Sequence, residues 1–176
     1  MSMKLLLAIA TLGMAGAPAF AHVTLERSEA PVGSTYKAVL RVPHGCDGKP
    51  TNIVRVKLPQ GYYAVKPMPK PGWKLEKLVG KYEKPYDNHG TRMTEGVTEV
   101  VWSGGNLLDD EYDEFVMRGS LGPDLEVGST LRFLVVQECP DGAAERWIEV
   151  PAAGQSGDDL EMPAPSLKLL EKASGH

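Results

Sequence analysis

The stretch TNIVRVKL at residues 51–58 decides the fold class, because its apolar and charged side chains alternate with a period of two. Val54, Val56 and Leu58 fall on one face. Arg55 and Lys57 fall on the other face, as in a β-strand that has one side on a core and the other in solvent. A helix would instead space its apolar residues three or four positions apart. The stretch therefore predicts a half-buried strand.

Short segments of the same kind recur along the chain, and Gly-Pro turns such as Pro59-Gln60-Gly61 and Pro71-Gly72 separate them. They cover residues 22–26, 36–42, 97–102, 114–118, 131–138 and 146–150. Several short strands without a long amphipathic helix favour an all-β fold. We expect an antiparallel β-sandwich with an immunoglobulin-like or cupredoxin-like two-sheet architecture, and a closed barrel is the alternative.

Two segments do not follow the strand pattern. Residues 82–95 are polar and rich in turn formers, which predicts a long loop. From residue 152 onward Gly, Ser, Pro and Ala accumulate, so residues 152–176 are expected to be a flexible tail with a short helix at residues 167–173. One sandwich domain is then expected over residues 22–151.

The first 21 residues have the pattern of a secretory signal peptide. Lys4 precedes an apolar run that ends in Ala19-Phe20-Ala21, with small residues at the two positions that signal peptidase reads. The run is short for a membrane span and no cationic stop-transfer segment follows it. We expect cleavage between Ala21 and His22 and a soluble periplasmic or secreted product.

Charge and cysteine content narrow the function classes. Loss of Lys4 with the signal peptide leaves 18 Lys and Arg against 23 Asp and Glu, so the formal charge changes from -4 to -5 and nucleic acid is not an expected partner. Cys46 and Cys139 lie 93 positions apart in a chain predicted to be exported, where a structural disulfide is favoured. The alternative is a pair of thiolate copper ligands.

His22 is the residue with the most chemical information. Cleavage before it creates an α-amino group next to its own imidazole, so one residue offers two nitrogen ligands. The amine and Nδ1 can chelate one metal ion, and paired nitrogen donors favour Cu(II) over cations that prefer oxygen. Both nitrogens must be neutral to bind, so affinity is expected to fall as pH drops through about 6 to 8.

The sequence around His22 and several later motifs resemble one known family. An N-terminal His22-Val-Thr with Glu29 seven positions later resembles the start of the YcnI-like copper-binding domains. The later matching motifs are RVP at 41–43, KPGW at 70–73, VWSGG at 101–105, DEF at 113–115, QEC at 137–139 and RWIE at 146–149. The resemblance covers nearly all of residues 22–151.

This resemblance implies one Cu(II) per chain in a single-histidine brace. The implied ligands are the amine and imidazole of His22 and the carboxylate of Glu29, with the Trp147 indole nearby to shield the metal. Two simpler interpretations stay open. Glu29 is alternatively an ordinary turn carboxylate, and Trp147 is alternatively plain core packing.

Other candidate ligands are weaker. His44 is expected on an exposed turn, His89 in the polar loop and His176 at the end of the tail. The methionines form no Met-x-x-Met cluster, so no Cu(I) site is evident. The acidic residues between Asp109 and Glu114 are interpreted as a solvated face in preference to a calcium site.

The leading functional hypothesis is a periplasmic Cu(II)-binding protein without enzymatic activity, either a metallochaperone or a sequestering factor in copper homeostasis. Its expected partners are copper, a membrane copper transporter or another periplasmic copper carrier. One alternative is a protein-interaction or adhesion sandwich in which His22 is incidental. A copper-dependent oxidative enzyme is less favoured, because no second histidine has a sequence context matching that of known brace enzymes.

Overall fold

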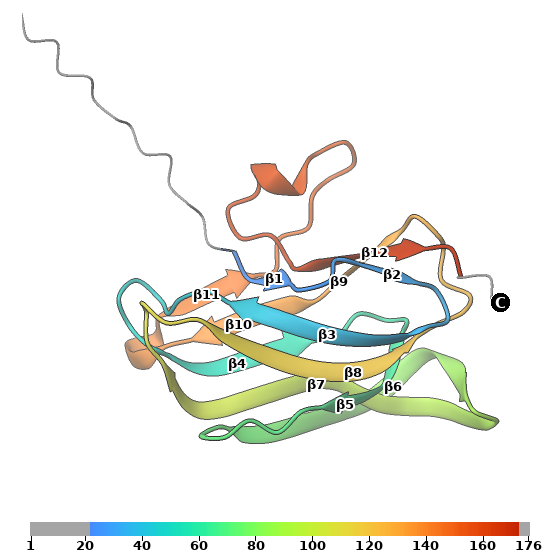
Figure 1. Ribbon diagram of the computed structural model, residues 1–176, viewed down its shortest axis with the longest axis horizontal. Helices are drawn as coiled ribbons and strands as arrows, with labels where there is room; N and C mark the ends of the chain where they lie inside the picture. Colours follow the sequence, from blue (N-terminus) through green and yellow to red (C-terminus); the bar gives the residue numbers. More distant parts are fainter. Residues whose placement is uncertain (1–21, 173–176) are drawn as a thin grey trace, which may run out of the picture.

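The computed structural model describes residues 22–172, which fold almost entirely into β-strands (Figure 1). In chain order the first six strands are β1 (Thr24–Leu25), β2 (Glu29–Pro31), β3 (Thr35–Val42), β4 (Thr51–Lys57), β5 (Tyr62–Pro67) and β6 (Lys74–Asn88). The later six are β7 (Thr91–Leu107), β8 (Asp113–Leu121), β9 (Thr130–Arg132), β10 (Leu134–Glu138), β11 (Ala144–Trp147) and β12 (Ser166–Leu170). Two 3-10 turns, η1 (Pro140–Gly142) and η2 (Gly157–Asp159), are the helical pieces of the described chain.

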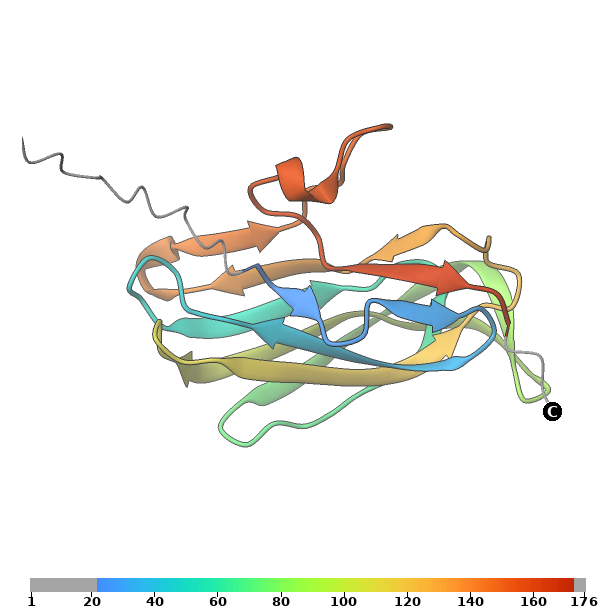
Figure 2. The same cartoon turned by 45° about the horizontal axis from the view of Figure 1, so that its top comes forward.

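Two main sheets make the sandwich. One has the strand order β1-β3-β8-β5 and the other β11-β10-β4-β7-β6, and every pair within them is antiparallel (Figures 1 and 2). Trp102 of β7 and Phe115 of β8 come from opposite sheets, and their ring centroids are 5.4 Å apart. The predicted antiparallel sandwich is confirmed.

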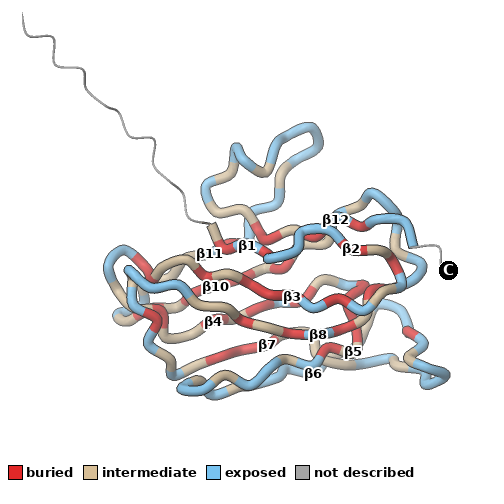
Figure 3. Tube along the Cα trace, in the orientation of Figure 1, coloured by how far each residue is buried: buried red, intermediate tan, exposed pale blue. Residues whose placement is uncertain are grey.

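The strand that decided the fold class behaves as its alternation requires. Val54 and Val56 are fully buried in the core between the sheets. Arg55 faces outward, where its guanidinium pairs with Glu99 at 2.8 Å and Glu138 at 3.2 Å. Buried residues also recur along β3, β4, β8 and β10 (Figure 3).

A third, small sheet corrects the expectation for the C-terminal segment. β12 pairs parallel to β2 and antiparallel to β9, and it lies along the edge of the sandwich (Figure 2). Leu167 and Leu169 are fully buried, and Lys168 between them is exposed. The predicted helix at residues 167–173 is therefore wrong up to residue 172, and β12 is not a flexible tail. The Leu167 and Leu169 alternation has the period of a strand, but the segment is too short to decide the matter by sequence alone.

The expected loop at residues 82–95 is also wrong. β6 and β7 continue through it as a hairpin that turns at His89 and Gly90, whose φ angles are 54° and 82°. Positive φ at both central positions is the geometry of a tight hairpin turn. β6 is an edge strand exposed along most of its length, so its composition is that of a loop.

The predicted signal peptide, residues 1–21, lies outside the described residues. Within residues 22–172 no helix is long and apolar enough to cross a lipid bilayer.

Candidate metal centre

His22 is held at the beginning of the described chain by its neighbours. Val23 is buried with 1% of its surface exposed, and β1 pairs with β3 through Thr24 and Arg41. Because the next residues are fixed in this way, the imidazole of His22 is placed against the sandwich and does not trail into solvent. Its ring centroid lies 5.6 Å from that of Trp147, with the ring planes at 59°.

Trp147 is packed in the core and also lies beside His22, whereas a role in shielding a metal stays a prediction. It ends β11, opposite Val135 of β10, and only 4% of its surface is exposed, so it belongs to the core. It also contacts the His22 ring. The structure therefore brings His22 and Trp147 together, as the resemblance implied, while the indole contributes to packing.

His44 reaches the same indole from the loop between β3 and β4. Its ring centroid is 6.2 Å from that of Trp147, and its Nδ1 lies 2.7 Å from the backbone oxygen of Gly45. Since a carbonyl oxygen only accepts hydrogen bonds, Nδ1 is the donor. His44 is half-buried, so the expectation of an exposed turn is wrong.

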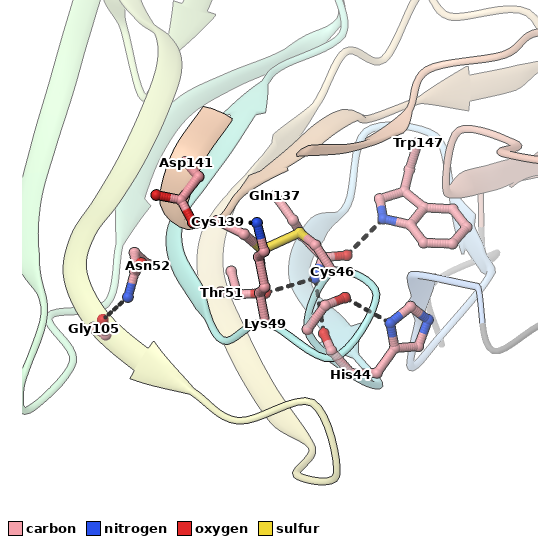
Figure 4. Close-up of a disulfide and its surroundings, with 11 residues drawn as sticks. His44, Cys46, Lys49, Thr51, Asn52, Gly105, Gln137, Cys139, Asp141 and Trp147 are labelled. Atoms are coloured by element: carbon pink, nitrogen blue, oxygen red, sulfur yellow. Dashed lines mark hydrogen bonds and ion pairs between the residues drawn. A yellow bond between two sulfur atoms is a disulfide. The ribbon is translucent and has the colours of Figure 1, made fainter. Parts of the chain in front are cut away.

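Gln137 fixes the relative positions of these groups and was missed by the sequence analysis. Its fully buried amide accepts a hydrogen bond from Trp147 Nε1 at 2.6 Å (Figure 4). The same amide donates to the His44 backbone oxygen and to Thr51 Oγ1, both at 2.9 Å. A buried amide with partners on both ends orients what it touches. One signal was present in the sequence, since Gln137 occupies an inward position of β10 two residues after Val135.

The predicted disulfide between Cys46 and Cys139 is confirmed, so the two sulfurs are not metal ligands here. It ties the His44 loop to the chain eight residues before Trp147 (Figure 4). Gly45 is needed beside it, because a Cβ atom there would lie 2.0 Å from the backbone oxygen of Lys49. The cysteine pairing, followed through to its neighbours, is the signal that could have placed His44 near Trp147.

Glu29 lies on β2, half exposed, and its carboxylate is 3.8 Å from Lys168 Nζ on the adjacent strand β12. His22 lines an open pocket together with Arg132, Asp158 and Ser28, and Ser28 directly precedes Glu29 in the sequence. Among residues 22–172, no group of three or more His, Cys, Asp and Glu side chains is gathered closely enough to hold a metal ion. Participation of Glu29 thus stays a prediction.

The donors present nevertheless fit copper in one respect. A brace needs only one histidine side chain, because the second nitrogen is the α-amine, which exists only after the bond between Ala21 and His22 is cut. Two half-buried imidazoles that contact one buried indole bring nitrogen donors to one end of the domain. Nitrogen donors of this kind suit Cu(II) better than Ca²⁺ or Mg²⁺.

The remaining candidates lie elsewhere. His89 is at the turn of the β6–β7 hairpin. Asp113 of the acidic run is bound to Lys70 Nζ at 2.6 Å, so its carboxylate is already neutralised by a cation. His176 lies outside the described residues.

Comparisons with known proteins agree with this architecture. The profile of the family described as "Domain of unknown function (DUF1775)" matches residues 22–169. Among solved structures, the chain is similar to an uncharacterized protein from Nocardia farcinica with an immunoglobulin-like fold. The two share 25% sequence identity and a TM-score of 0.63, over 85% of this chain and 98% of that one.

A cohesin from scaffoldin B of Acetivibrio cellulolyticus aligns over 84% of this chain and 97% of its own, but with 7% identity and a TM-score of 0.45 it adds nothing to the argument. No curated protein matches the chain. Since the family profile spans His22, both cysteines, Trp147 and most of β12, the chain belongs to the DUF1775 family.

Proposed function

We propose that this protein binds one Cu(II) ion in the cell envelope, through the α-amine and the imidazole of His22 after removal of the signal peptide. The observation that carries the proposal is the position of His22. The first residue after the predicted cleavage point lies against a buried tryptophan, 5.6 Å between ring centroids, at the end of the domain where the chain begins. The likeness of its motifs to YcnI-like copper-binding domains supports the same assignment.

The surroundings of His22 suit a bound cation that must be retained. A chelate formed by one residue loses little conformational entropy on binding, and the anchored Val23 reduces that loss further. The Trp147 indole limits the access of water from one side. Glu29 is the proposed carboxylate donor. Its contact with Lys168 is exposed and therefore weak, so it costs little to break.

The role that fits this site is metal transfer or storage in copper homeostasis. A site at the edge of the fold, formed by a chain terminus, leaves a bound ion accessible to a second protein. The proposed partner is a membrane copper transporter or another periplasmic copper carrier, and no enzymatic activity is assigned.

The test compares two purified chains that differ by one residue, one beginning at His22 and one with an extra Gly before it. The extension keeps every side chain but converts the α-amine of His22 into an amide, which cannot ligate in the same way. Cu(II) titration against a competing chelator should give one tight equivalent for the first chain and at least a hundredfold weaker binding for the second. His89→Ala in the first chain is the matched control, because it removes a histidine at the distant hairpin and should leave affinity unchanged.

Equal binding by the two chains would contradict the proposal. The interaction sandwich, in which His22 is incidental, would then be the better account of the fold.

A further inference from the structure

Two histidines from different parts of the chain contact one indole. His22 stands at the start of the described chain and His44 in the β3–β4 loop, and their ring centroids lie 5.6 and 6.2 Å from that of Trp147. Three aromatic groups meeting in this way place two imidazoles at one end of the sandwich. The motif around His22 involves a single histidine, and only the cysteine pairing connects His44 with this part of the sequence.

The hydrogen bond of His44 decides which of its nitrogens can bind a metal. Nδ1 donates its proton to the Gly45 backbone oxygen at 2.7 Å. In the neutral ring, Nε2 then carries the lone pair. Metal-binding histidines in proteins are usually held in this manner, with one nitrogen bonded to a carbonyl group and the other directed at the metal.

The backbone under His44 is also fixed. Its carbonyl accepts the hydrogen bond from the buried Gln137 amide, which holds Trp147 through its other end. Cys46, two residues later, is in the disulfide with Cys139. The imidazole and the indole are therefore held by one rigid set of contacts before any ligand arrives, which is what a preorganised site requires (Figure 4).

We infer that His44 Nε2 is a third nitrogen donor to the copper ion that His22 binds. This inference rests on the proposed function and adds a ligand that the single-histidine brace lacks. A neutral imidazole adds affinity for Cu(II) without adding charge, and it links the metal directly to the disulfide-bonded loop. A three-nitrogen donor set would also weaken the argument against an oxidative enzyme, which rested on the lack of a second histidine in a matching sequence context.

The experiment uses the chain that begins at His22, loaded with one equivalent of Cu(II), and pulsed EPR, which detects the remote nitrogen of each coordinated imidazole. The unmodified protein should show two imidazoles. His44→Asn should show one, with affinity lowered about tenfold, equivalent to about 1.4 kcal/mol. Asn retains an amide that can donate to the Gly45 oxygen, so the loop is preserved while Nε2 is removed. His89→Ala should again show two.

Two failures are distinguishable. A single imidazole in the unmodified protein, unchanged in His44→Asn, would overturn the role of His44 and leave the brace of His22 intact, provided that the Gly-extended chain still loses binding. If the Gly-extended chain binds as tightly as the unmodified one, the proposed function fails, and the inference fails with it. His44→Ala, with circular dichroism to confirm folding, repeats the count without any polar substitute.

Discussion

Trp102 and Trp147 are both buried indoles, with 0% and 4% of their surfaces exposed, yet they do different things. Trp102 lies in the middle of β7, donates to the Met68 backbone oxygen at 3.1 Å and packs against Phe115. Trp147 ends β11, donates to the Gln137 side chain and contacts two histidines. Burial alone would assign both to the core. What separates them is the chemistry of the rings around them, because Phe115 can only pack, whereas His22 and His44 can bind protons or a metal.

The largest expected effect comes from truncating the tryptophan that only packs. Trp102→Ala should lower the free energy of unfolding by about 3 to 5 kcal/mol, because it leaves a cavity between the two sheets. Urea denaturation monitored by circular dichroism measures the loss. The Cu(II) affinity of the folded fraction should not change, and Trp102→Phe serves as the milder variant if the alanine variant does not fold. A loss of copper affinity in folded Trp102→Phe would contradict the prediction that Trp102 serves packing alone.

The disulfide ranks next, because it holds the loop on the Trp147 side. Replacing Cys46 and Cys139 together by Ala should destabilise the domain by about 2 to 5 kcal/mol. Unlike Trp102→Ala, it should also weaken Cu(II) binding in the folded protein, since the His44 loop loses its tether. Thermal unfolding and copper titration of the same sample separate the two effects. Unchanged copper affinity would show that the loop is held by its other contacts alone.

A substitution of Gln137 tests the comparison between Trp102 and Trp147 with a smaller expected loss of stability. Gln137→Leu leaves the Trp147 N–H and the His44 carbonyl without their partner, at a cost of about 1 to 3 kcal/mol for each buried group. The EPR spectrum of bound Cu(II) should change because the indole and the loop are no longer oriented by a shared amide. Asn52→Ala is the control, since it removes a different side-chain amide, bonded to the Gly105 backbone oxygen. An identical spectrum in Gln137→Leu would mean that the amide serves stability alone.

The smallest effect at neutral pH concerns Tyr36, a buried residue of β3. Burial raises the pKa of Tyr36 to about 12. Since the unfolded value is about 10, the folded state keeps its proton longer. The stabilisation is fully present below about pH 10 and is lost as pH rises toward 12. Burial also raises the pKa of Tyr62, which contributes with the same sign.

Tyr36→Phe should therefore reduce the loss of stability between pH 9 and pH 11, as measured by urea midpoints at each pH. The proposed copper binding should have the opposite dependence, because protons compete for the nitrogen ligands as pH falls. The domain should thus lose stability at high pH, whereas the site should lose copper affinity at low pH. A Tyr36→Phe variant with the same alkaline slope as the unmodified protein would show that other groups cause it.

The sequence predicted the parts of the fold that depend on local alternation. Val54 and Val56 alternate with charged residues, and their burial follows from that pattern alone. The same rule misled where a strand lies at an edge, because β6 is exposed on most of its length and only Tyr86 in it is buried. It also failed for β12, whose Leu167 and Leu169 join the core because the strand pairs with β2 and β9, which lie far away in the sequence.

The residues of the candidate site also differ in how far the sequence alone could identify them. His22 could be singled out because the predicted cleavage would give it an α-amino group beside its own imidazole, a property that depends only on its position in the sequence. His44 and Gln137 could not be assigned, because their roles come from contacts that join the β3–β4 loop, β10 and β11. The disulfide was predictable from the expected export of the chain and from its two cysteines, but the resulting position of His44 beside Trp147 is visible only in the structure.

The most direct test of the account uses the three tryptophans as internal reporters. In a two-dimensional NMR spectrum of the ¹⁵N-labelled chain beginning at His22, each indole N–H gives one signal. Cu(II) broadens nearby signals with a steep dependence on distance, and Trp147 and Trp102 are separated by three strand spacings, about 14 Å. Substoichiometric Cu(II) should erase the Trp147 signal first and leave those of Trp102 and Trp73 largely intact, whereas equal broadening of all three would contradict a site at His22.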